Sequence, residues 1–300
     1  MKQLKALIHR NVKLFFKDKG LFFTSLITPV ILLVLYVTFL GNVYRDAFLS
    51  TFAAGVVLPE RLVDGYVGAQ LVSSLLAVSA VTVAFCSNML MVQDKVNGTI
   101  ADFTVSPVSP RRMALGYYIS TLLVTLIVCY AAAGVCFAYM AIVGWYLSPA
   151  DVLLILLDVL LLVMFGTALS SLINFFLSSQ GQISAVGSIV SSGYGFISGA
   201  YMPISQFSPW LQNAIAFFPG TYGTSLLRRH AMRGVFEALG EEGVPDAVVD
   251  IVRDAVDCNV YFFEKQVPAY AGYLILVGTV LLLIGACVLL HVKRGKRARK

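Results

Sequence analysis

Six stretches of the chain are apolar and long enough to cross a lipid bilayer, and they restrict the fold more than any other feature. A helix needs about 20 apolar residues to span roughly 30 Å of hydrocarbon. Backbone polar groups in lipid must be satisfied within their own segment, so each stretch is predicted to be helical. The expected fold is an all-α, polytopic integral membrane protein with six transmembrane helices. The six stretches are approximately residues 21–41, 66–92, 113–146, 152–177, 182–201 and 268–292.

The composition agrees with a membrane protein. Hydrophobic residues make up 58% of the chain and charged residues only 13%, whereas about a quarter of the residues of a soluble domain are charged. The net charge of +6 is concentrated at the two termini, beside apolar runs. That placement is typical of membrane topology, so no nucleic-acid partner is expected.

Lysine and arginine are divided unequally between the two sides that six spans create. Fifteen lie in the N-terminal tail, the loop between spans two and three, and the C-terminal tail 293–300, while seven lie on the other side. Cytoplasmic loops carry the excess of positive charge. Both termini and the loop between spans two and three are therefore predicted to be cytoplasmic.

Residues 1–20 are predicted to form an amphipathic helix that lies along the membrane surface. Apolar residues recur in this tail at helical spacing, with the basic residues mostly on the opposite face. A positively charged tail without structure is the alternative. The apolar residues are Leu4, Leu7, Ile8, Val12, Phe15 and Phe16.

The segment 202–267, on the outer side, precedes the last span. Its first part is apolar but too short and too rich in proline to cross a membrane, so it is predicted to be re-entrant, dipping into the bilayer against protein. An amphipathic helix is predicted next, with Pro245 in its first turn. Its apolar face consists of Val244, Ala247, Val248, Ile251, Val252, Ala255 and Val256. The residues that mark the re-entrant part are Pro203, Pro209, Trp210 and Pro219.

Motifs for catalysis are missing from the sequence. The three histidines lie far apart in no metal-binding pattern, and the chain has no G-x-x-x-x-G-K-[ST] loop to hold ATP phosphates. The five cysteines follow neither metal-site nor disulfide spacing. We therefore expect no catalytic residue, no bound cofactor and no metal, and the chain itself is not expected to be an enzyme.

Asp158 is the one acidic residue well inside a predicted span. A carboxylate at the centre of a membrane helix costs about 2.5–3.5 kcal/mol on insertion scales. Two interpretations stay open: a polar point beside a transport path or helix contact, or a partly hydrated group that pairs locally.

The fifth apolar stretch is rich in small residues, and Gly195 and Gly199 form a G-x-x-x-G pair within it. Small side chains let helices approach closely in lipid. The pair predicts either a dimer seam or close packing within one chain, and the Gly-Ser content also makes this helix a candidate for bending.

A polar stretch, "MVQDKVNGTIADFTVSPVSPRR", interrupts the apolar runs at residues 91–112. Gly98 permits a turn, and Pro107 and Pro110 stiffen the return of the chain. Ser109 followed by Pro110 suits the start of the third span. The stretch is predicted to be a short, stiff element at the membrane surface, with an inert loop as the alternative.

This arrangement resembles the membrane-spanning permease subunit of ATP-binding cassette exporters, the ABC type-2 permease family, over essentially the whole chain. Residues 198–223 are similar to the outer re-entrant signature of the family. In the polar stretch, the family has an acid–base pair, Gly-Thr, an acid and Ser-Pro, but Ala101 replaces the expected acid. The matching residues are Asp94, Lys95, Gly98, Thr99, Ser106 and Pro107, with Asp102 one place late.

The resemblance implies a single transmembrane domain over residues 1–300. It consists of the interfacial helix 1–20, spans one to five in 21–201, the outer re-entrant and amphipathic segment 202–267, span six in 268–292, and the basic cytoplasmic tail 293–300. A multi-pass protein of a bacterial-type plasma (inner) membrane is expected.

The resemblance also implies a mechanism with partners. Two permease subunits, identical or related, dock two separate ATPase subunits, which bind ATP and Mg. The element between spans two and three, with Asp94, Lys95, Gly98, Thr99, Asp102, Ser106 and Pro107, is the coupling element. Spans one and five form the dimer seam, and the amphipathic N-terminal helix also touches the ATPase.

The predicted function is that of the transmembrane subunit of an ATP-driven exporter of a hydrophobic or amphipathic small molecule, such as a drug or antibiotic. Export of a lipid or polysaccharide is an alternative. A self-sufficient secondary transporter or channel is a further one, although such proteins usually carry more intramembrane charge than Asp158 alone.

Overall fold

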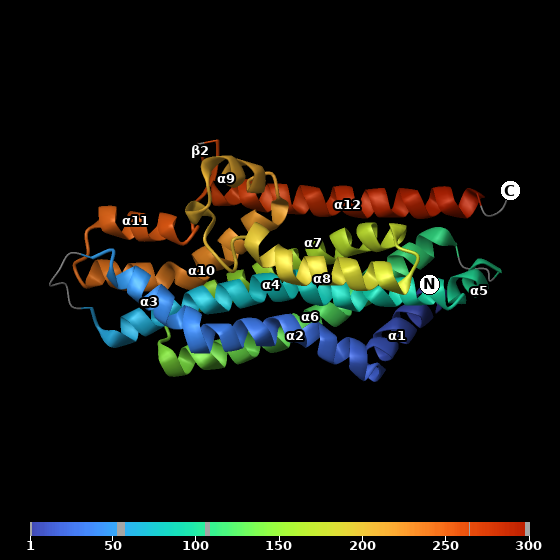
Figure 1. The fold of residues 1–300 in the computed structure, drawn as a ribbon, viewed down its shortest axis with the longest axis horizontal. Coiled ribbons are helices and arrows are strands. Elements are labelled where there is room, and N and C mark those ends of the chain that lie inside the picture. The colour runs from blue at the N-terminus through green and yellow to red at the C-terminus, as the bar shows by residue number, and fades with distance from the viewer. Residues whose placement is uncertain (1, 53–57, 106–108, 264, 298–300) are drawn as a thin grey trace.

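The computed structural model describes residues 2–52, 58–105, 109–263 and 265–297. These residues form an elongated bundle of helices, with both termini and α5 at one end and α3 and α11 at the other (Figure 1). The α-helices are α1 (Lys2–Lys17), α2 (Lys19–Leu35), α3 (Gly41–Leu49), α4 (Glu60–Val96), α5 (Thr99–Val105), α6 (Pro110–Val143), α7 (Pro149–Phe176), α8 (Gln180–Ile197), α9 (Pro209–Ile215), α10 (Pro219–Glu241), α11 (Asp246–Ala255) and α12 (Ala269–Arg297).

Five helical stretches of the described chain are long and apolar enough to cross a membrane. They are the continuous helix Lys19–Leu49, then α4, α6, α7 and the first 25 residues of α12. The fifth predicted span, 182–201, is also helical as α8, but the 18 residues of α8 include many Gly, Ser and Gln. A polytopic, helical membrane protein is therefore confirmed, while the count of six rests on α8.

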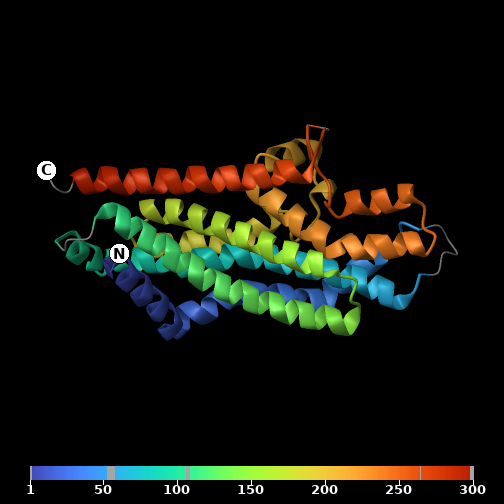
Figure 2. The ribbon, with the colours of Figure 1, turned by 180° about the vertical axis from the view of Figure 1, so that it is seen from behind.

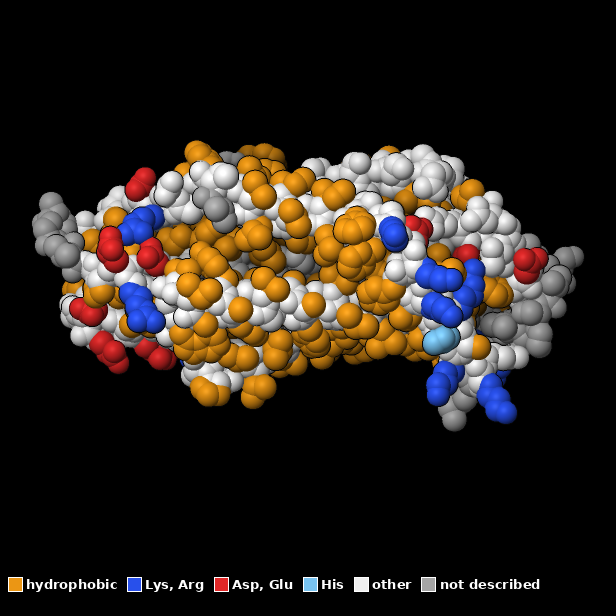
Figure 3. Space-filling view, turned by 90° about the horizontal axis from the view of Figure 1, so that it is seen from below, with side chains coloured by type: hydrophobic (Ala, Val, Ile, Leu, Met, Phe, Trp, Pro, Cys, Tyr) orange, Lys and Arg blue, Asp and Glu red, His pale blue; other side chains and the backbone are white. Residues whose placement is uncertain are grey.

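The surface agrees with this reading (Figure 3). On the face shown, a broad hydrophobic band covers the middle of the bundle, and charged side chains gather at its two ends. Many large apolar side chains are exposed on α2, including Phe23, Ile27, Ile31 and Val34. Such an exposed band suits lipid or another membrane protein as its surroundings and does not suit water.

Helix α1 confirms the predicted N-terminal amphipathic helix. It runs at an angle to α2 and packs across α6 (Figure 2). Leu7 and Phe15 are buried on its inner face, and a Cβ at Gly116 of α6 would lie 2.4 Å from Leu7 Cδ2. Asp18 then ends α1 and caps α2, accepting a hydrogen bond from the Leu21 N–H at 3.1 Å.

Helix α4 is the centre of the bundle and contacts α2, α6, α7, α8 and α10. Small residues on α4 and its neighbours allow these close contacts. Gly166 of α7 lies so near α4 that an added Cβ would be 2.9 Å from Val81 Cα and 3.0 Å from the Ala80 carbonyl oxygen. The continuous helix Lys19–Leu49 is less regular. It contains Pro29 and widens into a π-helix at Tyr36–Leu40, and both features commonly bend membrane helices.

The outer segment contains more structure than the sequence predicted. After the 3₁₀ turn Ile204–Gln206 and the short α9, helix α10 packs against α4, α7 and α12. The predicted amphipathic helix is confirmed as α11, with Pro245 at its N-cap and not inside its first turn. A two-stranded antiparallel hairpin, β1 (Val260–Phe262) with β2 (Lys265–Val267), pairs Val260 with Val267 and is the only sheet in the described part of a fold otherwise helical.

Candidate functional site

An apolar groove of about 840 Å³ opens along the bundle between α2, α3, α4, α8 and α11. Helices α2 and α3 form one wall, and α8, residues 201–206 and α11 form the other, with α4 as the floor. None of the lining residues in the described chain is charged. They include Ile27, Ile31, Leu35, Phe39, Val43, Tyr44, Phe48, Tyr66, Gln70, Ser188, Ser191, Ser192, Phe196, Tyr201, Met202, Pro203, Gln206, Val252 and Val256.

The floor of the groove holds one unusual polar group, the carboxamide of Gln70. Gln70 is fully buried, and neither its nitrogen nor its oxygen has a hydrogen-bond partner among the described residues. Nearby hydroxyls are already engaged: Tyr44 donates to the Tyr201 carbonyl at 3.1 Å, and Ser192 donates to the Ser188 carbonyl at 2.7 Å.

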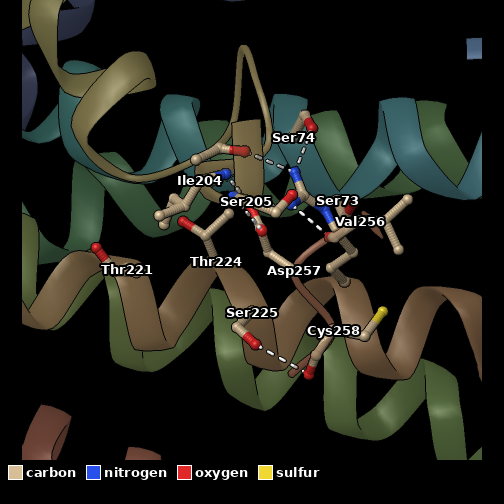
Figure 4. Close-up of polar contacts among 12 residues, drawn as sticks. Ser73, Ser74, Ile204, Ser205, Thr221, Thr224, Ser225, Val256, Asp257 and Cys258 are labelled. Atoms are coloured by element: carbon tan, nitrogen blue, oxygen red, sulfur yellow. Dashed lines mark hydrogen bonds and ion pairs between the residues drawn. The ribbon is translucent and has the colours of Figure 1, made fainter. Parts of the chain in front are cut away.

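A buried arginine holds Val256, one of the groove-lining residues, in place. Figure 4 shows the polar contacts around Val256, Asp257 and Ser74. Arg228 of α10 is completely buried. Its guanidinium donates to the carbonyls of Val256 at 2.7 Å and Gly199 at 2.9 Å, and to Ser74 Oγ of α4 at 3.2 Å. One side chain therefore joins α4, α10, the end of α8 and the chain after α11.

Asp257 completes this arrangement. It lies 3.4 Å from the Arg228 guanidinium and accepts hydrogen bonds from the backbone N–H groups of Ile204 at 2.5 Å and Ser205 at 3.1 Å. Burial raises the pKa of the Asp257 carboxyl above its ordinary value, while Arg228 and the two N–H groups act in the opposite direction. Sequence reasoning missed this pair, because nothing in the local pattern links positions 29 residues apart.

Asp158, the acid inside a span, is held between three helices. His230 Nδ1 of α10 lies 2.6 Å from Asp158 Oδ2, and the Tyr273 hydroxyl of α12 donates to Oδ1 at 2.8 Å. Both carboxylate oxygens thus face protein groups, and Asp158 is almost fully buried. It does not line the apolar groove. His230 also borders a separate polar cavity between α10, α11 and the hairpin.

At the opposite end, Asp94 lies inside the bundle. Its carboxylate accepts two hydrogen bonds from Arg10 of α1, both at 2.8 Å, and one from the Tyr117 hydroxyl of α6 at 2.6 Å. Arg10 also stacks over the ring of Phe103 in α5, 5.5 Å from its centroid. Asp94, which the resemblance assigns to the coupling element, thus joins α1, α4 and α6, and its charge is matched within the chain.

Lys95, the next residue, binds a different helix. Its ammonium group donates to the carbonyls of Asn174 at 2.6 Å, Phe175 at 2.8 Å and Leu177 at 3.0 Å. These carbonyls at the end of α7 have no partner within the helix, and a cation satisfies them while favouring the negative end of the helix dipole.

The remaining residues of the predicted coupling element fall around α5. Gly98 has φ +78°, with open space where a Cβ would be, so it makes the turn after α4. Thr99 begins α5, and Asp102 is exposed in its first turn. Ser106 and Pro107 lie outside the described residues. Ser109 and Pro110 start α6 as the sequence predicted, with Ser109 Oγ accepting from the Arg112 N–H at 3.4 Å.

The two glycines of the G-x-x-x-G pair, Gly195 in α8 and Gly199 just after its end, both face their own chain. A Cβ at Gly195 would lie 2.4 Å from the Tyr201 ring, and one at Gly199, where φ is +74°, would lie 2.9 Å from Ile204 Cγ1. Both glycines are buried. Their geometry matches the intramolecular interpretation, because the turn after α8 folds back against them; the exposed face of α8 carries Ser184, Ser188 and Ile189 instead.

The prolines expected in a re-entrant segment lie at the starts of helices and of a turn. Pro203 precedes the 3₁₀ turn, and Pro209 and Pro219 occupy the first positions of α9 and α10. Trp210 is 72% exposed on α9. The segment lies beside the start of α12, at the side of the bundle (Figure 1).

Comparison with known proteins gives one result that covers most of the chain. Residues 2–230 match the family model of the ABC-2 type transporter. No curated protein matches the chain. Within the described residues, no group of three or more His, Cys, Asp or Glu side chains is placed to hold a metal ion.

Proposed function

The chain belongs to the ABC-2 type transporter family, and we propose that it is the transmembrane subunit of an ATP-driven exporter. The uncharged groove of about 840 Å³ between α2, α4 and α8 carries this proposal. A pocket of this size, lined mainly by apolar and aromatic groups, suits one drug-sized molecule. The groove supports a hydrophobic or amphipathic small molecule, such as a drug or antibiotic, over a polysaccharide.

The proposed topology has six crossings in a bacterial-type plasma membrane, with α8 as the fifth. An 18-residue helix is about 27 Å long, close to the hydrocarbon thickness. An even number of crossings returns the chain to the side on which it started, in keeping with the two termini at one end of the bundle (Figure 1). Both termini are proposed to be cytoplasmic, and residues 202–218 re-entrant from the outer side.

Energy is proposed to come from a separate ATPase subunit that binds ATP and Mg. Helix α5 and the turn at Gly98 form the proposed docking element, supported by their position beside α1 at the end that carries both termini. Asp94 and Lys95 act behind this element: they connect it to α1, α6 and α7 and do not touch the partner. Asp102, exposed on α5, is the acid available for direct contact.

A second permease subunit is proposed to pack on the face formed by α2 and α8. Exposed apolar residues on α2 and exposed small residues on α8 support such a seam. In that position the second subunit closes the open side of the groove. Asp158 is proposed to be a helix contact between α7, α10 and α12, in line with its two protein partners.

The test is reconstitution with an ATP-binding cassette ATPase subunit, sought first among the genes that adjoin that of this chain. We expect the two proteins to co-purify and to move a hydrophobic fluorescent substrate across the membrane of proteoliposomes with ATP. Replacement of the Walker lysine of the ATPase should abolish this movement. Transport that persists without that lysine would contradict an ATP-driven exporter and favour a secondary transporter or channel.

A further inference from the structure

Gln70 is a polar group that the fold leaves without a partner at the border of the groove. It lies in the first third of α4, and its side chain is fully buried. Among the described residues neither end of the carboxamide has a hydrogen-bond partner. Buried polar groups are almost always paired, so each exception calls for an explanation.

No hydrogen bond within the described residues engages the Gln70 carboxamide, and several hydroxyls of the groove lining are used elsewhere. The hydroxyls of Tyr44 and Ser192, also in the groove lining, donate to backbone carbonyls, and the Tyr201 hydroxyl donates to the Ser191 carbonyl at 3.3 Å. The rest of the lining is predominantly hydrocarbon. A glutamine side chain has three rotatable bonds, and Gln70 is one of the residues that line the groove, so a change of rotamer is the movement that would bring its carboxamide to a molecule bound there.

The lining also excludes full charges. None of the described residues around the groove is acidic or basic. An ionised group would lose its hydration there without gaining a countercharge, whereas a neutral donor or acceptor would gain the bond that the Gln70 amide lacks.

We propose that the groove binds an uncharged, mostly apolar molecule that carries one neutral hydrogen-bonding group, such as an amide, a carbonyl or a hydroxyl, and that this group pairs with Gln70. This inference rests on the proposed function for its biological setting but not for its test. The proposed class of ligand excludes phospholipids, because their headgroups are charged, and polysaccharides, because they lack an apolar body.

The test uses three probes with the same aromatic body: 1-pyrenecarboxamide, 1-methylpyrene and 1-pyrenecarboxylate. Binding to the purified full chain in detergent is measured by native mass spectrometry, which also reports whether the chain is a monomer or a dimer. The wild type should bind the carboxamide about tenfold more tightly than the methyl compound, and the carboxylate most weakly.

Two variants remove the amide, and a third is the matched control. Gln70→Met keeps the length of the side chain, and Gln70→Leu serves if the methionine disturbs packing. Either should weaken carboxamide binding about tenfold and leave methylpyrene binding within a factor of about two. Thr125→Val removes another unpartnered buried polar group, which lies on α6 away from the groove, and should change neither probe.

Equal binding of the carboxamide by wild type and Gln70→Met would overturn the proposal, as would tightest binding of the carboxylate. A loss of dimer in Gln70→Met without a change in probe binding would also overturn it, by assigning Gln70 to the second subunit. None of these measurements needs the ATPase. Selective binding without ATP-dependent export of the carboxamide would contradict the proposed function and leave the site intact.

Discussion

Arg10 and Asp94, 84 residues apart in sequence, form a bidentate ion pair in which both nitrogen–oxygen distances are 2.8 Å. Asp94 is almost buried, whereas the Arg10 side chain is 33% exposed. The pair attaches the amphipathic helix α1 to the core of the bundle. Tyr117 adds a third contact to the same carboxylate.

Removing either partner should loosen α1. Because a buried charge without its partner is costly, we expect Asp94→Lys, which adds a second cation beside Arg10, to destabilise the protein more than Arg10→Gln. For Arg10→Gln the partial exposure of Arg10 reduces the expected loss to about 1–2 kcal/mol. Thermal unfolding in detergent provides the measurement. Lys13→Gln, an exposed change on the same helix, is the control; an equal shift in Lys13→Gln would refute a role specific to the pair.

Lys95→Met should fray the end of α7. The variant keeps the apolar stem but leaves the three carbonyls of Asn174, Phe175 and Leu177 without their cation. Hydrogen exchange of the last turn of α7 should become faster by about tenfold or more, while the middle of α7 should not change. Lys95→Arg keeps the charge, and its exchange rate in the last turn of α7 is expected to lie between those of the wild type and Lys95→Met. Unchanged exchange in Lys95→Met would show that water replaces the lysine.

Gly98→Ala should lower the stability of the protein through backbone strain alone. The position has φ +78° but open space for a Cβ, so the strain of a left-handed alanine, about 1–2 kcal/mol, is the whole expected effect. Gly98→Asn should cost less, because asparagine adopts this conformation more readily. Stability and ATP-driven transport are measured together. Loss of transport in Gly98→Ala, with the bundle still folded, would support the coupling role of this turn.

Cys258 should resist thiol reagents in the folded protein. It is 4% exposed, and burial raises the pKa of its thiol from 9.0 to about 12. Since the folded state holds the proton more tightly than the unfolded state, this stabilising contribution is complete below pH 9 and is lost as the pH rises towards 12. In a variant with Cys258 as its sole cysteine, maleimide labelling at pH 8 should require unfolding.

Arg228→Met should expose that thiol. The change removes the hydrogen bonds to Val256 and Gly199 that fix the chain beside Cys258, and loss of the partner leaves Asp257 buried without its cation. Labelling of Cys258 at pH 8 should accelerate severalfold in the otherwise folded variant. Arg229→Met, the exposed neighbour on α10, is the matched control and should leave the rate unchanged.

Trp210 should lie at the membrane–water interface. It is 72% exposed on α9, and no charged residue occurs between Val159 and Leu227. Tryptophan prefers the level of the headgroups. The chain has two tryptophans, so Trp145→Phe isolates Trp210 fluorescence. Lipids brominated near the headgroup should quench it more than lipids brominated near the chain end; quenching by aqueous iodide alone would place α9 in water.

Long periodic patterns made much of the fold predictable. The helix α1 and the Ser109-Pro110 start of α6 were predicted, because each signal lies within one continuous stretch of sequence. Helix α10 escaped prediction, since Arg228, Arg229, His230 and Arg233 interrupt its apolar pattern. Arg228 is nevertheless buried, because its partners come from distant segments.

The site was harder to predict than the helices. Asp94 and Lys95 were singled out as a pair, yet their partners are distant in sequence: Arg10 lies 84 residues before Asp94, and Asn174 at the end of α7 lies 79 residues after Lys95. Gly195 and Gly199 also have contacts that the sequence pattern did not reveal. The pattern indicated a close approach, and the turn at residues 198–204 places side chains of the same chain, Tyr201 and Ile204, against the two glycines.

The last turn of α4 holds two helices through two consecutive residues. Asp94 binds α1 through Arg10, and Lys95 binds the carboxyl end of α7. Neighbouring residues on a helix point about 100° apart, so one small rotation of this turn pulls on both helices at once. Both attachments therefore depend on the orientation of the same helical turn, and a displacement of α1 that is transmitted through Asp94 also moves the end of α7.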